Sequence, residues 1–195
     1  MIQKKLDIKG FTSLNGDGAR PFTLNILLFG SEGAGKSRFI ATAPDPIGGL
    51  VLDPKSEISI RREMELSGKQ IVLPDAELTK EFIYDKDLTE LRKMDQEKYM
   101  EHYQGRVDRM TDLLMSLANS KDIRTIFIDP FYQFAAEVKK ALQGKKQKMK
   151  RTDSGKVFQD NDGVYQTCIG ILNRINTKHT ILTFKYKDEY VNDNK

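Results

Sequence analysis

Apolar residues along this chain gather in short continuous runs that are bounded by glycine, proline or charged residues. The run LNILLF at 24–29 stops at Gly30, and the run TIFI at 125–128 ends in Asp129. Short runs of this kind, rich in β-branched residues, are typical of strands that are buried on both faces of a sheet. The same pattern predicts further strands over 49–53, 70–73 and 179–184.

Between these runs the apolar residues follow the period of a helix. From about 95 to 118 they recur at three- and four-residue spacing, which predicts a helix with one buried stripe. The stripe consists of Tyr99, Tyr103, Val107, Met110, Leu114 and Leu117. Other helices are predicted over 36–43, 56–67, 130–142 and 163–176.

The alternation of strands and helices predicts the fold class. It favours an α/β fold in which a mainly parallel central sheet carries helices on both faces. The chain has 195 residues, 38% of them hydrophobic, which suffices for one main core. We therefore predict a single domain over 22–195, preceded by a glycine-containing N-terminal extension over 1–21.

Several classes of protein are excluded by what the sequence lacks. No apolar stretch approaches the roughly 20 residues that span a bilayer, and the first residues lack the apolar core of a signal peptide. We therefore expect a cytoplasmic protein that does not enter the membrane. Cys168 is the single cysteine and is expected to be buried. With only His102 and His179 beside it, the sequence contains no plausible zinc site.

The segment Gly30 to Ser37 reads GSEGAGKS and fits the P-loop pattern G-x-x-x-x-G-K-[ST] at every fixed position. It follows a predicted strand and opens a predicted helix, which is the context that the motif requires. A triphosphate needs many N–H donors around a compact anion, and only a glycine-rich loop lets the backbone approach so closely. The segment therefore predicts a nucleoside triphosphate site.

Two side chains of this loop have predicted roles of their own. Lys36 is expected to reach the β- and γ-phosphates, and the Ser37 hydroxyl to ligate Mg²⁺. The nucleotide-binding residues predicted from the motif are Gly30, Ser31, Glu32, Gly33, Ala34, Gly35, Lys36, Ser37 and Arg38.

Asp129 is the predicted carboxylate partner of the metal. It ends the strand TIFID, which we expect to lie beside the P-loop strand and to deliver one carboxylate to Mg²⁺. Many buried strands end in an aspartate that caps the next helix, and here Pro130 follows, so capping is the competing interpretation. The strong P-loop upstream favours the metal role.

Four blocks together resemble the RecA-like P-loop ATPases of bacteriophages, among them the single-strand annealing ATPases. The blocks are LNILLFGSEGAGKS, GLVLDPKSE, RTIFIDPFYQF and HTILTFKYKDEY, and the resemblance covers most of residues 22–188. It implies a RecA-like core, ATP with Mg²⁺ as the ligand, and a role with single-stranded DNA in phage recombination or replication. Self-association into an oligomer and a single-strand binding or replication protein as partner are implied as well.

The chain departs from this family where the water-activating glutamate is expected. The family strand ends in an Asp-x-Glu type sequence, whereas this chain has Asp53, Pro54 and Lys55. Glu57 lies two residues further on and is the catalytic candidate, although an exposed carboxylate at a helix start is an equal alternative. Asp53 is the next candidate, and weak turnover is the remaining one.

The end of the last predicted strand carries Lys185 and Lys187. They are similar to the paired lysines with which RecA-like subunits touch the nucleotide of a neighbour. In trans they would supply the cationic charge that an arginine finger supplies elsewhere.

A block of positive charge lies in the segment 144–157, which its glycines and low apolar content predict to be a loop. Such a block either contacts nucleic acid phosphates or is a solvated loop, and it lacks the aromatic residues on which bases stack. The DNA-binding candidates in it are Lys145, Lys146, Lys148, Lys150 and Arg151.

Two other functions compete with a DNA-associated ATPase. A small-molecule phosphotransferase would use the same loop and metal, but usually adds an arginine-rich lid, whereas this basic loop is dominated by lysine. A nucleotide-binding assembly module with little turnover is favoured by Lys55. The chain also ends soon after the last predicted strand, so we expect it to be truncated relative to the family.

Overall fold

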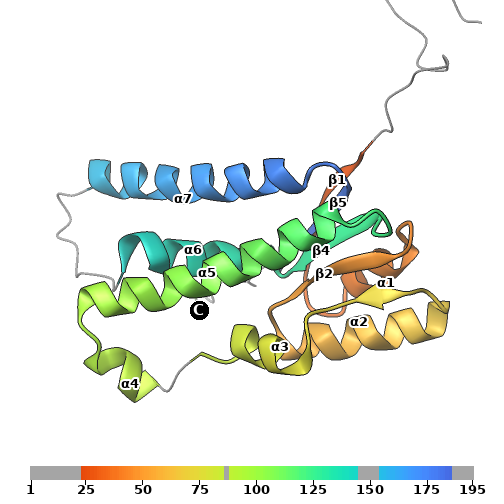
Figure 1. The fold of residues 1–195 in the computed structure, drawn as a ribbon, viewed down its shortest axis with the longest axis horizontal. Helices are drawn as coiled ribbons and strands as arrows, with labels where there is room; N and C mark the ends of the chain where they lie inside the picture. Colours follow the sequence, from red (N-terminus) through yellow and green to blue (C-terminus); the bar gives the residue numbers. More distant parts are fainter. Residues whose placement is uncertain (1–22, 86–87, 145–153, 186–195) are drawn as a thin grey trace, which may run out of the picture.

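A computed structural model describes residues 23–85, 88–144 and 154–185 of the chain. Its centre is a five-stranded, all-parallel sheet with the strand order β1-β5-β4-β2-β3 (Figure 1). The parallel sheet confirms the α/β fold class. The strands are β1 (Asn25–Gly30), β2 (Ile47–Val51), β3 (Ile71–Val72), β4 (Thr125–Asp129) and β5 (His179–Lys185).

Helices connect the successive strands, as a parallel sheet requires. The long helix α5 has the predicted stripe, with Tyr103, Met110 and Leu114 all fully buried. The helices are α1 (Lys36–Thr42), α2 (Pro54–Ser67), α3 (Ala76–Ile83), α4 (Leu88–Lys93), α5 (Gln96–Asn119), α6 (Phe131–Gln143) and α7 (Ser154–Ile175).

The helices cover both faces of the sheet, as the continuous apolar strands predict. Alternate residues of β4 enter different cores: Ile126 and Ile128 pack with α5, α6 and α7, whereas Phe127 packs on the face of α1 and α2. Figure 1 shows these two groups of helices on opposite sides of the sheet. A strand that is buried on both faces explains why β4 has no polar residue between Thr125 and Asp129.

Aspartates begin three of the helices. Asp53 accepts hydrogen bonds from backbone N–H groups at the start of α2, and Asp75 and Asp95 do the same for α3 and α5. Such caps satisfy backbone donors that have no partner inside the helix. The cap of α2 bears on function, because it fixes Asp53 at the carboxyl edge of the sheet.

The structure corrects the sequence-based fold in three places. The strand β4 does not lie beside the P-loop strand, because β5 is inserted between β1 and β4. The helix α7 begins at Ser154, inside the segment that we expected to be a loop up to 157. The short helices α3 and α4 were not predicted, because their few apolar residues give no long periodic pattern.

Some predictions fall on residues that the structure does not describe. These are the N-terminal extension over 1–21 and all five DNA-binding candidates of the basic loop. In the described parts of the chain, none of the helices combines the length and apolar content that a membrane-spanning segment requires.

Candidate functional site

The P-loop connects the end of β1 at Gly30 to the start of α1 at Lys36. Gly33 and Gly35 both have a φ of 81°, in the left-handed region that residues with a Cβ rarely adopt. Gly35 is the N-cap of α1 and provides no side-chain acceptor for the first N–H groups of the helix. The glycines of the motif are therefore required by the backbone of this loop, as the sequence pattern predicts.

Lys36 folds back over the loop that precedes it. Its ammonium donates hydrogen bonds to the carbonyl oxygens of Gly30 and Ser31, at 2.8 and 2.7 Å. Both carbonyls are exposed or only partly buried, so the contacts hold the loop without tying the lysine to the core. The ammonium is thus kept at the site where a phosphate would approach.

The loop borders a hollow of about 350 Å³, within the range of small-molecule sites. Most of the predicted site residues line this hollow. They are Glu32 to Arg38 of the loop, together with Asp129 and Lys185. Gly30 and Ser31 do not line it, and their carbonyl oxygens are occupied by Lys36. The complete lining is Glu32, Gly33, Ala34, Gly35, Lys36, Ser37, Arg38, Lys55, Ser56, Ser59, Glu63, Asp129 and Lys185.

Strand register explains why these residues meet. At the carboxyl edge of the sheet Gly30 of β1 pairs with Lys185 of β5, and Asp129 of β4 pairs with Val51 of β2. Ligands of parallel α/β sheets bind outside this edge. The P-loop, a lysine and a carboxylate are therefore brought to one place by strands that lie far apart in the sequence.

Asp129 is a buried carboxylate, only 2% exposed. Burial raises its pKa, although hydrogen bonds from the hydroxyls of Thr183 and Ser56 and the nearby charge of Lys36 oppose that shift. The helix that follows Asp129 has no side-chain cap, since its N-cap residue is Pro130. The structure thus contradicts the capping interpretation and leaves Asp129 facing the hollow.

Ser37 and Asp129 are the residues that fit a bound Mg²⁺. Mg²⁺ prefers oxygen ligands and usually takes only one or two protein side chains, with phosphate and water oxygens completing the shell. A hydroxyl and a carboxylate that line one hollow with the P-loop match this requirement. Among the described residues there is no cluster of three or more His, Cys, Asp or Glu that would form a metal cage, which this kind of site does not need.

Glu57, the predicted water-activating residue, does not line the hollow. Its carboxylate accepts a hydrogen bond from Arg61, one turn further along α2, at 3.0 Å. Because Glu57 lies outside the hollow and its carboxylate is paired with Arg61, the structure does not support its catalytic role.

We expect the substitution Glu57→Gln to leave the rate of nucleotide hydrolysis within about twofold of the original. It removes an exposed i,i+4 ion pair, which contributes at most a few tenths of a kcal/mol to stability. A steady-state turnover assay measures the effect, with a thermal melt as the control for folding. A loss of turnover by orders of magnitude would restore Glu57 as the catalytic carboxylate.

Lys185 lies in the hollow of its own chain. Its ammonium donates to Asp53 Oδ2 at 2.6 Å, so within one chain it is a neighbour of the P-loop and not a free surface group. This position does not match the trans contact that the resemblance implies. Lys187 lies outside the described residues.

The same hollow contains residues that the motif analysis did not identify. Ser56, Ser59 and Glu63 lie on one face of α2, at spacings of three and four residues, and all three line the hollow. Lys55, also in the lining, forms an exposed ion pair with Glu32 of the P-loop at 2.8 Å. The helical spacing was readable from the sequence, but nothing in it indicated which face of α2 would meet the P-loop.

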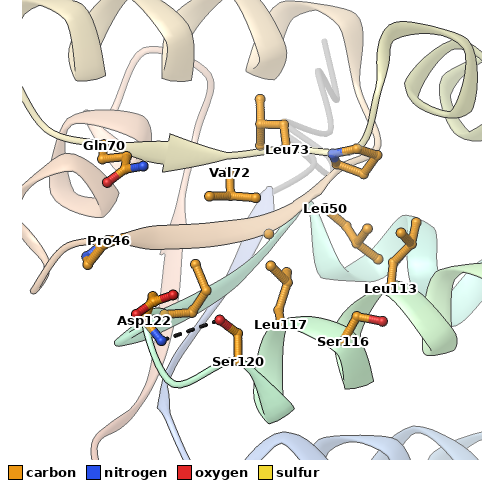
Figure 2. A pocket seen from close by; sticks show the side chains of 13 residues that line it. Pro46, Leu50, Gln70, Val72, Leu73, Leu113, Ser116, Leu117, Ser120 and Asp122 are labelled. Atoms are coloured by element: carbon orange, nitrogen blue, oxygen red, sulfur yellow. Dashed lines mark hydrogen bonds between the residues drawn. The ribbon is translucent and has the colours of Figure 1, made fainter.

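A second, more apolar hollow of about 670 Å³ lies between β2, β3 and the second half of α5 (Figure 2). In Figure 2, Leu113 and Leu117 point from α5 toward Leu50 and Val72 of the strands. None of the predicted nucleotide or metal residues lines it.

Cys168 is buried, as predicted, and burial raises the pKa of its thiol to about 11, so it is no candidate nucleophile.

Comparison with known proteins gives limited information. The chain matches no protein-family model and no curated protein. Among solved structures, a prototypical ATPase from the type III secretion system of pathogenic bacteria is similar over 87% of this chain, with a TM-score of 0.45 and 12% sequence identity. This chain covers 47% of that ATPase chain. A similarity at this level assigns neither a family nor an activity, so the function is inferred from the hollow itself.

Proposed function

We propose that this protein binds ATP with Mg²⁺ in the P-loop hollow and hydrolyses it. One observation carries the proposal: the P-loop residues from Glu32 to Ser37 and the buried Asp129 line a single hollow at the carboxyl edge of a parallel sheet. The choice of ATP among the nucleotides rests on the resemblance to the phage ATPases.

Each residue has a defined task in this proposal. The backbone N–H groups of residues 33–37 donate to the phosphates, and Lys36 exchanges its loop carbonyls for phosphate oxygens. Ser37 and Asp129 would hold the metal, which would supply positive charge against the phosphates. Burial disfavours the ionised form of Asp129 and raises its pKa, so ionising this carboxylate lowers the stability of the fold. Such buried carboxylates are typical of functional sites.

A turnover assay with Mg²⁺, with and without single-stranded DNA, tests this function against its alternatives. Release of phosphate from ATP without an acceptor supports an ATPase. Formation of ADP that requires an added small-molecule acceptor, with the phosphoryl group recovered on that acceptor, indicates a phosphotransferase. Tight binding without turnover indicates an assembly module. Failure to bind any nucleotide in the presence of Mg²⁺ contradicts the proposal as a whole.

We further propose that the ATPase acts on single-stranded DNA as an oligomer. The support is the cationic composition of the segment 144–157 together with the resemblance to phage recombination ATPases. A cluster of lysines without aromatic residues suits contact with phosphates and not with bases. Binding should therefore depend strongly on salt and weakly on DNA sequence.

Replacing four of these lysines with glutamine tests the DNA proposal. If about four lysines contact phosphates, log K should fall against log salt with a slope near −3 in the original protein, from ~0.7 per phosphate. The variant should bind all single-stranded sequences more weakly and with a flatter slope, while ATP binding persists. Fluorescence anisotropy over a salt series measures both quantities. The substituted residues are Lys145, Lys146, Lys148 and Lys150.

A matched control replaces lysines elsewhere, at Lys69, Lys80, Lys98 and Lys121, which changes the net charge by the same amount. Equal losses in the two variants would assign DNA binding to overall charge. An unaltered affinity and slope in the loop variant would contradict the proposed contact.

A further inference from the structure

An ion pair stands at one wall of the P-loop hollow. Lys185, the last residue of β5, donates to Asp53 Oδ2 at 2.6 Å, and the two side chains are only 22% and 15% exposed. Because Lys185 pairs with Gly30 in the sheet, its side chain starts directly beside the first residue of the P-loop. The pair is therefore both partly shielded from water and adjacent to the proposed phosphate position.

The two partners are not equally accessible from the hollow. Lys185 lines it and Asp53 does not, so a ligand in the hollow would contact the lysine and not the carboxylate. A lysine has three donor hydrogens on a flexible stem and can turn from one anion to another. A phosphate group in the hollow would compete with Asp53 for this ammonium.

Asp53 is held in place independently of the lysine. Its Oδ1 accepts the backbone N–H groups of Lys55 and Ser56 at 2.8 and 3.2 Å, which caps α2. Burial by itself would raise the pKa of Asp53, but the hydrogen bond from Lys185 and the cap bonds lower it, so the carboxylate stays ionised. Asp53 is thus a fixed anion, and Lys185 is the mobile member of the pair.

We infer that Lys185 senses the terminal phosphate of a bound triphosphate in its own chain, and that Asp53 sets how strongly it responds by competing for the same ammonium. The inference rests on the proposed nucleotide function of the hollow. A diphosphate lacks the terminal group and leaves the Lys185–Asp53 pair intact. Lys185 then favours triphosphate over diphosphate, and the strength of its ion pair with Asp53 limits that preference, because a ligand shifts an equilibrium only by its differential contacts.

Two substitutions should change the preference in opposite directions. Lys185→Met removes the sensing cation and should weaken binding of a non-hydrolysable ATP analogue by about tenfold, with ADP binding changed by less than about twofold. Asp53→Asn removes the competing charge and should strengthen binding of the analogue by about three- to fivefold. Asparagine caps helices as well as aspartate does, so α2 is expected to remain intact.

The double variant distinguishes competition for the ammonium from a merely structural role of the two residues. Once Lys185 is absent, there is no ammonium for which Asp53 can compete with the phosphate. Asp53→Asn should therefore leave the affinity of the Lys185→Met protein for the ATP analogue unchanged. Calorimetric titration with the ATP analogue and with ADP, both with Mg²⁺, measures the affinities of the original full chain, the two single variants and the double variant. Glu81→Gln is the matched control, since it breaks a different, exposed ion pair with Arg109 outside the hollow.

The outcomes separate this inference from the proposed function. Opposite shifts in the triphosphate-to-diphosphate ratio in the two single variants, with a double variant that behaves like Lys185→Met, support the sensing role. An unchanged ratio in Lys185→Met and Asp53→Asn proteins that still bind nucleotide overturns the sensing role and leaves the proposed function standing. If the original protein binds neither nucleotide, the proposed function fails, and the sensing role fails with it.

Discussion

Replacing Lys36 by alanine is expected to weaken ATP binding by about a hundredfold or more, while the fold persists. Truncating one partner of a partly desolvated charge contact costs about 2 to 5 kcal/mol, and 1.4 kcal/mol is a factor of ten. The ammonium donates to two carbonyl oxygens of its own loop and the side chain is half-buried outside the core, so its removal leaves no cavity there. Titration with a fluorescent ATP analogue measures the affinity, and circular dichroism reports the fold.

Lys178→Ala is the matched control for this prediction. Lys178 is also half-buried and also donates to a backbone carbonyl, that of Ser120, at 2.6 Å, but it does not line the P-loop hollow. Its replacement should leave ATP binding unchanged. Equal affinities for the Lys36→Ala protein and the original would contradict the phosphate-binding role of the loop.

The substitution Asp129→Asn is expected to have two opposite effects. Turnover with Mg²⁺ should fall by about a hundredfold or more, because the metal loses a charged ligand that stabilises the transition state. The ligand-free protein should become more stable at neutral pH. Burial raises the pKa of Asp129 in the folded state, so its ionised form costs stability, and a neutral amide of the same shape removes that cost.

The sign of the pH dependence follows from the raised pKa. When the pKa of a carboxyl group is higher in the folded than in the unfolded state, the protein loses stability as pH rises above the pKa of the unfolded state. The gain in melting temperature for Asp129→Asn should therefore be larger at pH 8 than at pH 4. Asp122→Asn, an exposed carboxylate outside the P-loop hollow, should change neither property. If Asp129→Asn lowered nucleotide binding without Mg²⁺ as much as it lowers turnover with Mg²⁺, the metal role of Asp129 would be contradicted.

The sequence predicted the strands and long helices well, because these elements have strong local signals. The apolar runs at β1, β4 and β5 and the stripe of α5 are each visible within a window of a few turns. The start of α7 was misplaced because its first residues, SGKVFQ, combine a glycine and a lysine with few apolar positions. Propensity in such a segment is weak, and tertiary packing decides.

The strand order was harder to predict than the strands. That β5 is inserted between β1 and β4 depends on where the crossover through α7 returns, which no local pattern encodes. The consequences for the site follow from that order: Lys185 meets Gly30, and Thr183 meets Asp129. The P-loop was readable as a motif, whereas the Lys185–Asp53 pair and the lining face of α2 required the assembled sheet.

Sheet topology also sets the time at which the P-loop site can form. In the part of the chain that the structure describes, β1 pairs only with β5, and β5 begins about 150 residues after β1 ends. At ~5–20 residues per second, a ribosome needs roughly 10 to 30 seconds to make that intervening chain. Over this interval β1 lacks the strand with which it pairs in the described sheet, and pairing at such sequence separation is slow. The P-loop hollow, which needs both β1 and β5, is therefore expected to be among the last parts of the described fold to form.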